Sequence, residues 1–150
     1  MSNTFLNEET HVQIKKLCAK GDALVEQKDF ESALTCYRDA LNLVPIPREP
    51  WEATTWILAA IGDLHFAAGE MEKALNALED AVRCVGGLGN PFIHLRLGEC
   101  CFELGETDRA ADELTRAYMG AGREIFEQEN PKYFEFLATR IKPPVGHDEL

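Results

Sequence analysis

The chain has 150 residues, of which 45% are hydrophobic and 27% are charged, a composition typical of one folded domain and not of a disordered segment. Its formal net charge is −11, so nucleic-acid backbones and anionic membrane surfaces would repel it. We therefore expect no nucleic acid and no membrane as partner, but a basic or amphipathic protein or peptide, unless the acidic surface serves solubility alone.

The N-terminal stretch MSNTFLNEETHVQIKKL has no continuous apolar core of the kind that a signal peptide needs. The five cysteines form no C-x-x-C pair, so neither a zinc site nor a disulfide framework is indicated. We expect the thiols to pack as small apolar side chains in a reducing cytosol, which makes the protein cytoplasmic. Residues 1–9 and 143–150 are expected to be mobile ends, although the final letters GHDEL match a retention address of the endoplasmic reticulum.

Small and apolar residues recur with one spacing in three segments, which begin at Phe30, Met71 and Thr107. The offsets follow one face of an α-helix. Alanines occupy the same two positions in every segment: Ala33, Ala74 and Ala110, then Ala40, Ala81 and Ala117. The sequence therefore predicts three equivalent amphipathic helices.

A glycine lies nine residues before each segment, at Gly21, Gly62 and Gly98. Because glycine inside a helix costs about 1 kcal/mol relative to alanine, these glycines indicate a preceding helix that packs closely against the next one. Gly69 and Gly105 lie between the two helices, where they suit a left-handed helix stop. The pattern predicts three helical hairpins.

This pattern resembles the tetratricopeptide repeat (TPR), and a small bacterial three-repeat protein in particular. The resemblance implies an all-α fold, a right-handed solenoid of three TPR hairpins that form a single domain over residues 1–150. The expected elements are repeats at roughly 14–45, 50–86 and 91–121 and a C-terminal capping helix at 131–141.

The glycines are 41 and 36 residues apart, against about 34 in the standard repeat. The first excess lies in PIPREPWEATT, which is either a Pro-rich linker or an extension of the next helix from Pro50. We prefer the extension, because Trp51 and Trp56 would be costly to leave in an idle loop.

No motif indicates catalysis. The four histidines lie far apart in the sequence, and we expect His65 and His94 to be hydrogen-bonded core residues. The Gly-rich stretch GGLGNP lacks the lysine of a phosphate-binding loop. We therefore predict no enzyme, no catalytic residue, no cofactor and no metal site.

In a stack of such hairpins the first helices line a concave groove, which the resemblance identifies as the partner-binding surface. The expected groove residues are aromatic or charged: Lys15, Asp22, Trp56, Asp63, Phe66, Phe92, Glu99 and Phe102. The aromatic side chains would supply most of the binding energy and the carboxylates would steer the partner. The alternatives are a contact through the insertion around Trp51, or a groove filled by the C-terminal helix.

The stretch that starts at NPFIHLRLGECC is similar to TPR proteins that accompany secreted toxins, which implies an immunity protein that neutralises such a toxin. The alternatives are a type III secretion chaperone and a self-associating scaffold subunit. We expect a monomer or a weak homodimer.

Overall fold

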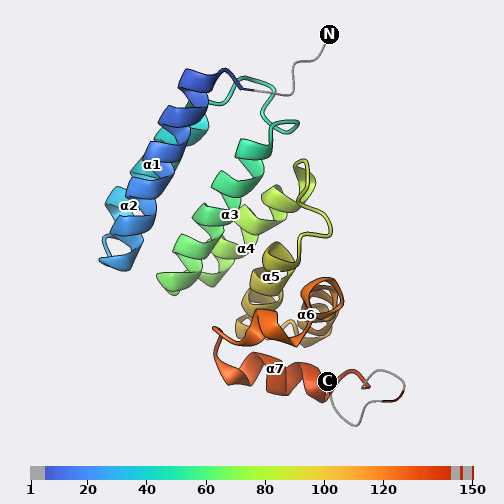
Figure 1. Ribbon diagram of the computed structural model, residues 1–150. Coiled ribbons are helices and arrows are strands. Elements are labelled where there is room, and N and C mark those ends of the chain that lie inside the picture. Colours follow the sequence, from blue (N-terminus) through green and yellow to red (C-terminus); the bar gives the residue numbers. More distant parts are fainter. Residues whose placement is uncertain (1–5, 143–145, 147–149) are drawn as a thin grey trace. The chain divides into compact units, whose positions relative to one another are not determined.

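A computed structural model describes residues 6–142, 146 and 150, so most of the expected mobile ends lie outside the described residues. The elements, in chain order, are α1 (Glu8–Glu26), α2 (Phe30–Asn42), α3 (Glu52–Ala67), α4 (Met71–Arg83), α5 (Pro91–Glu103), α6 (Thr107–Ala121), the 3-10 turn η1 (Arg123–Phe126) and α7 (Pro131–Ala138). The described part of the chain contains no strand, which confirms the all-α prediction (Figure 1). No helix within it has the length and apolar character that a bilayer crossing requires.

The chain divides into two compact units. Unit 1 (Met1–Leu88) contains α1 to α4, and unit 2 (Gly89–Leu150) contains α5 to α7. The helices pack in sequence-adjacent pairs, α1 with α2, α3 with α4 and α5 with α6, which are the three hairpins that the glycine spacing predicts. The core of unit 1 gathers residues from both of its hairpins, with Ile14, Tyr37 and Ile57 almost fully buried.

A glycine on the first helix of each hairpin allows the second helix to approach closely. The pairs in contact are Gly21 with Tyr37, Gly62 with Leu78, and Gly98 with Leu114. A Cβ atom on any of these glycines would lie 2.6 Å from a side-chain carbon of its partner, closer than real Cβ contacts come. The close packing inferred from the sequence is therefore present in all three hairpins.

In each hairpin the two helices are joined by the same type of turn, although only two of the three turns contain a glycine. Gly69 and Gly105 have φ angles of +80°, and Lys28 takes the same left-handed conformation with a φ angle of +62°. In the first turn the Asp29 amide donates to the Leu24 carbonyl at 2.9 Å, and the other two turns repeat this bond. The bond satisfies a carbonyl that the end of the helix would otherwise leave without a donor.

The extra length before the second repeat is partly helix and partly loop. α3 has 16 residues, whereas α5 has 13, and the three additional residues lie before Gly62. The first helix of the second repeat is therefore extended at its N-terminal end, as we expected. The remaining residues form a loop that side chains hold in place: Thr54 Oγ1 donates to Arg48 O at 2.6 Å, and the Trp51 indole donates to Pro47 O at 3.0 Å. Trp51 is therefore fixed next to the start of α3.

The N-terminal helix begins earlier than expected. α1 starts at Glu8, and the Asn7 side chain accepts a hydrogen bond from the Thr10 amide at 2.8 Å. This cap satisfies an amide that the first helical turn leaves without a partner, so the expected mobile end at 1–9 is too long. At the other end α7 stops at Ala138. A further hydrogen bond from Ile141 N to Leu137 O at 3.1 Å continues the helical turn to residue 141, where we expected the capping helix to end.

Gly62→Ala should destabilise unit 1, although alanine normally favours a helix by about 1 kcal/mol over glycine. The added methyl group would overlap the Leu78 side chain, and overpacking of this kind costs about 1–3 kcal/mol. We expect the free energy of unfolding to fall by about 1 kcal/mol, measured by urea unfolding followed by far-UV circular dichroism.

The control is the double variant Gly62→Ala/Leu78→Ala. It should lose less stability than the sum of its two single variants, because the truncated side chain leaves room for the new methyl group. Additive losses, or a Gly62→Ala variant more stable than wild type, would contradict the close packing.

Candidate partner-binding site

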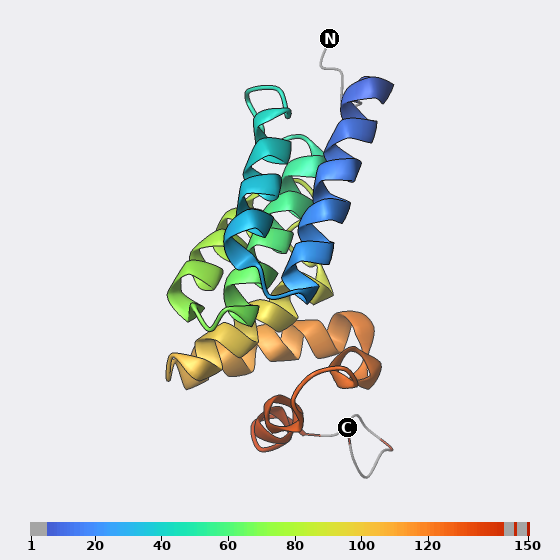
Figure 2. The same ribbon diagram turned by 90° about the vertical axis from the view of Figure 1, so that its left-hand side faces the viewer.

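α1 and α3 lie side by side in unit 1 and run in the same direction, as both views show (Figures 1 and 2). Each carries two predicted site residues seven positions apart: Lys15 and Asp22 on α1, Trp56 and Asp63 on α3. Seven residues make about two helical turns, so both members of a pair lie on one side of their helix. We call the surface around these four residues the α1–α3 face.

A cavity of about 480 Å³ lies at the N-terminal ends of α1 and α3. Its lining comes from both helices and from the loop before α3: Leu6, Glu8, His11, Lys15, Trp51, Glu52, Ala53 and Trp56. His11 meets Trp56 edge to face, with ring centroids 6.2 Å apart. Because both tryptophans of the chain line it, we call it the tryptophan cavity. It joins the insertion around Trp51 to Lys15 and Trp56, two regions that we expected to be alternative contacts.

An acidic pair, Asp22 and Asp63, lies two turns further along the same face. The hydroxyl of Tyr37 donates to Asp22 Oδ1 at 2.5 Å. Burial raises the pKa of Tyr37 most, the Asp22 carboxylate raises it further, and Asp63 also contributes, so both carboxylates act on one hydroxyl. Both aspartates are exposed. The structure therefore places two predicted site residues within electrostatic reach of the same hydroxyl.

Small side chains separate the tryptophan cavity from the acidic pair. Cys18 of α1 and Ala59 of α3 lie between the two sites along their helices, and both are half-buried. Burial raises the pKa of the Cys18 thiol to about 11, with smaller effects of Asp22 and Cys36, so the thiol is protonated at neutral pH. Phe66, also half-buried, follows Asp63 by one turn of α3.

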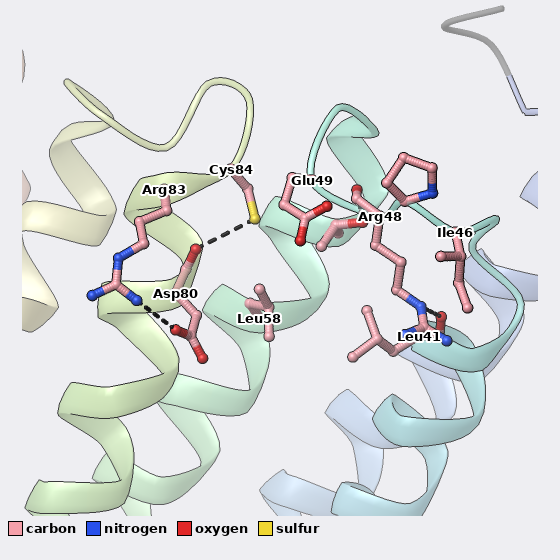
Figure 3. A pocket seen from close by; sticks show the side chains of 10 residues that line it. Leu41, Ile46, Arg48, Glu49, Leu58, Asp80, Arg83 and Cys84 are labelled. Carbon is pink, nitrogen blue, oxygen red and sulfur yellow. Dashed lines mark hydrogen bonds and ion pairs between the residues drawn. The ribbon is translucent and has the colours of Figure 1, made fainter.

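A second cavity in unit 1, of about 520 Å³, lies beside the same loop (Figure 3). Three of its four charged side chains already have partners within it. Arg48 Nε donates to Leu41 O at 3.0 Å, and Arg83 pairs with Asp80 at 3.0 Å. Its lining contains no aromatic residue, so it lacks the contacts that usually dominate binding energy. We therefore place the candidate site on the α1–α3 face.

In unit 2, Glu99 is fully buried, so the prediction that it is an exposed acid of the groove is wrong. Arg96 donates to Glu99 Oε1 and to Glu129 Oε1, each at 2.7 Å. Burial, and next the hydrogen bond with Glu129, raise the pKa of Glu99 to about 9. Glu99 is buried because the segment after η1 brings Glu129 to Arg96 and so encloses the Glu99 carboxyl group.

Phe102 belongs in part to the packing of unit 2. Its ring centroid lies 5.5 Å from that of Tyr133 and 5.1 Å from that of Phe136, both on α7. The C-terminal helix α7 therefore contacts the Phe102 side chain, which we had expected to contact a partner. A Phe102→Glu variant would consequently disturb unit 2 as well as any binding. Phe92 is 69% exposed at the start of α5 and stays a predicted contact.

The two repeat histidines are buried and hydrogen-bonded, as predicted. The Gly89 amide donates to His94 Nε2 at 2.9 Å, so the ring carries its proton on Nδ1 and donates it to Glu113 Oε2 at 2.9 Å. His65 Nδ1 lies 3.1 Å from Glu70 Oε1. Across residues 6–142 and positions 146 and 150, no group of three or more His, Cys, Asp or Glu residues is arranged to hold a metal ion.

Two family models, each described as tetratricopeptide repeat, match residues 13–85 and 59–124. Solved structures show the same fold at low identity. The type III secretion chaperone SycD of Yersinia enterocolitica, in complex with a peptide of the translocator YopD, is 16% identical with a TM-score of 0.68, over 89% of this chain and 95% of that chain.

The TPR domain of Sgt2 from Aspergillus fumigatus is 20% identical with a TM-score of 0.67, over 98% of this chain and 93% of that chain. The second TPR domain of human RPAP3, in complex with the HSP70 peptide SGPTIEEVD, is 16% identical with a TM-score of 0.63, over 87% of this chain and 96% of that chain. Comparison with curated proteins gives no match.

Glu99→Gln should remove a pH dependence of unfolding. The folded pKa of about 9 lies above the ordinary value of 4.5, so the folded protein holds a proton that the unfolded chain releases between these values. The resulting stabilisation is complete below the ordinary pKa and is lost as the pH rises through 9, by up to about 1.4 kcal/mol per pH unit. We expect wild type to lose stability relative to Glu99→Gln between about pH 5 and pH 8.5 in urea unfolding.

Glu103→Gln is the matched control. Hydrogen bonds from Lys132 and Tyr133 lower the pKa of Glu103, so its stabilising effect is present above the ordinary pKa and is lost only as the pH falls into the acid range. Glu103→Gln should therefore leave the slope near neutral pH unchanged. A stability difference between wild type and Glu99→Gln that stays constant with pH would show that Glu99 is ionised in the folded protein.

Proposed function

Because the chain belongs to the tetratricopeptide repeat family, we propose that it is a non-enzymatic interaction module that binds a segment of a partner protein on its α1–α3 face. The observation that carries the proposal is the tryptophan cavity, which lies on the same side of α1 as the exposed carboxylate of Asp22. Aromatic side chains in pockets supply most of the energy of such interfaces, and charges select and steer the partner.

The charges favour a basic or amphipathic segment. Asp22 and Asp63 are exposed, and the net charge of −11 adds a long-range attraction for cations. The solved complexes of SycD with a YopD peptide and of RPAP3 with an HSP70 peptide support a peptide ligand. An acidic peptide such as SGPTIEEVD would meet two carboxylates here, so we expect a ligand of the opposite charge.

The roles predicted from the sequence differ in the form of the partner. An immunity protein would hold a folded toxin domain, whereas a secretion chaperone would hold an unfolded segment, and a scaffold subunit would bind its own copies. The immunity role, the chaperone role and the self-associating role all stay predictions. Binding of a protein segment to the α1–α3 face is compatible with each of them.

Selection from a random dodecapeptide library on the immobilised full-length chain tests the proposal. We expect the selected peptides to be basic and to carry a bulky apolar residue. Asp22→Asn/Asp63→Asn should weaken their binding by up to about fivefold, because an exposed ion pair contributes about 0.2–1 kcal/mol. The affinities are measured by isothermal titration calorimetry, and for wild type they should fall with added salt.

The matched control is Asp39→Asn/Glu72→Gln, which removes the same charge from exposed positions on α2 and α4. This control should bind the selected peptides as wild type does. Selection of acidic peptides, equal weakening by both double variants, or no selection at all would contradict the proposal.

A further inference from the structure

Resting on the proposed function, we propose that the tryptophan cavity binds one arginine side chain of the partner segment. The indole rings of Trp51 and Trp56 contact this side chain, and the carboxylates of Glu8 and Glu52 pair with its guanidinium group. The inference names the residue that the cavity selects, whereas the net charge of the protein would favour any basic segment.

Both tryptophan rings are held in place by contacts within unit 1. The Trp51 indole N–H donates to Pro47 O at 3.0 Å, and the Trp56 ring meets the His11 ring edge to face. Both tryptophans are half-buried and both line the cavity. Because the rings are already anchored, a ligand loses little free energy in ordering them.

The charged groups of the lining favour a cation. Glu8 and Glu52 contribute two carboxylates, and Lys15 contributes one ammonium group. Both glutamates are exposed, and among the residues that the structure describes neither side chain has a hydrogen bond or an ion pair. Glu8 and Glu52 are the first residues of α1 and α3, which lie side by side and run in the same direction (Figures 1 and 2). The two carboxylates therefore belong to the same end of the cavity.

Lys15 lies two helical turns away from this acidic end. It follows Glu8 by seven residues, which corresponds to about 10 Å along α1 at a rise of about 1.5 Å per residue. The Debye length at physiological salt is about 8 Å, so repulsion between Lys15 and a cation beside Glu8 is largely screened. A cation in contact with the carboxylates keeps most of its attraction to them.

Arginine matches both parts of the lining, the rings and the carboxylates. Its planar guanidinium group stacks on aromatic faces, is more weakly hydrated than the ammonium group of lysine and carries five N–H donors. These donors suit two carboxylates that come from different helices. A phenylalanine side chain would contact the rings but would leave both carboxylates without a partner. The cavity volume of about 480 Å³ lies within the range of about 300–1,000 Å³ that is typical of ligand pockets.

The experiment titrates the isotope-labelled full-length chain with capped peptides Gly-Ser-X-Ser-Gly, in which X is arginine, lysine, citrulline or phenylalanine. The two tryptophans of the chain both line the cavity, so their indole N–H signals in the NMR spectrum report its occupancy. Citrulline has nearly the shape of arginine but no charge. We expect the arginine peptide to bind about tenfold more tightly than the citrulline peptide, equivalent to about 1.4 kcal/mol, and to bind more tightly than the other two.

Glu8→Gln/Glu52→Gln should abolish most of the preference for arginine over citrulline, because it removes both carboxylates and keeps both rings. The matched control is Glu31→Gln/Glu72→Gln, which removes two exposed carboxylates from the first turns of α2 and α4. This control should keep the preference of wild type. Added salt should weaken the binding of the arginine peptide and leave that of the citrulline peptide nearly unchanged.

Equal affinity for the arginine and citrulline peptides, or tightest binding of the phenylalanine peptide, would overturn the assignment of arginine. An unchanged preference in Glu8→Gln/Glu52→Gln, or indole signals that no peptide shifts, would overturn it as well. The library selection tests the proposed function separately, so that function fails only if the selection fails.

Discussion

The contact between Gly21 and Tyr37 is the one on which the candidate site depends. Because the glycine has no side chain, the tyrosine ring lies directly against α1 and its hydroxyl reaches Asp22. The equivalent residues of the other hairpins, Leu78 and Leu114, have no polar atom to carry to the surface. One interaction therefore closes the first hairpin and also holds Asp22 of the α1–α3 face in place.

The hairpins could be predicted because their signals are local and repeated. Small residues recur at the same helical offsets, and each glycine contacts a residue sixteen positions later in the same hairpin. The left-handed turn at Lys28 could not be predicted, since lysine rarely takes this conformation and the turn is stabilised by backbone hydrogen bonds. The equal spacing of the repeats also assigned Lys15 and Asp22 to one helix and Trp56 and Asp63 to the next but one, and their role in binding stays a prediction.

The sequence did not reveal the burial of Glu99 or the lining of the tryptophan cavity. Glu99 is enclosed by Arg96 and by Glu129, which arrives after a 3-10 turn that has no periodic pattern. Trp51 joins the cavity because a hydrogen bond to Pro47 sets the course of an irregular loop. Both features depend on loop geometry, which residue spacing does not encode.

The half-buried Cys18 gives the α1–α3 face a chemical property of its own. With a pKa of about 11, only roughly one thiol in ten thousand is ionised at pH 7, and the thiolate is the form that oxidants and electrophiles attack. A cysteine at the centre of a binding surface would ordinarily make that surface sensitive to peroxide or to alkylating agents. Here burial, and next the neighbouring aspartate, raise the pKa of the thiol, so Cys18 stays in the less reactive protonated form at neutral pH.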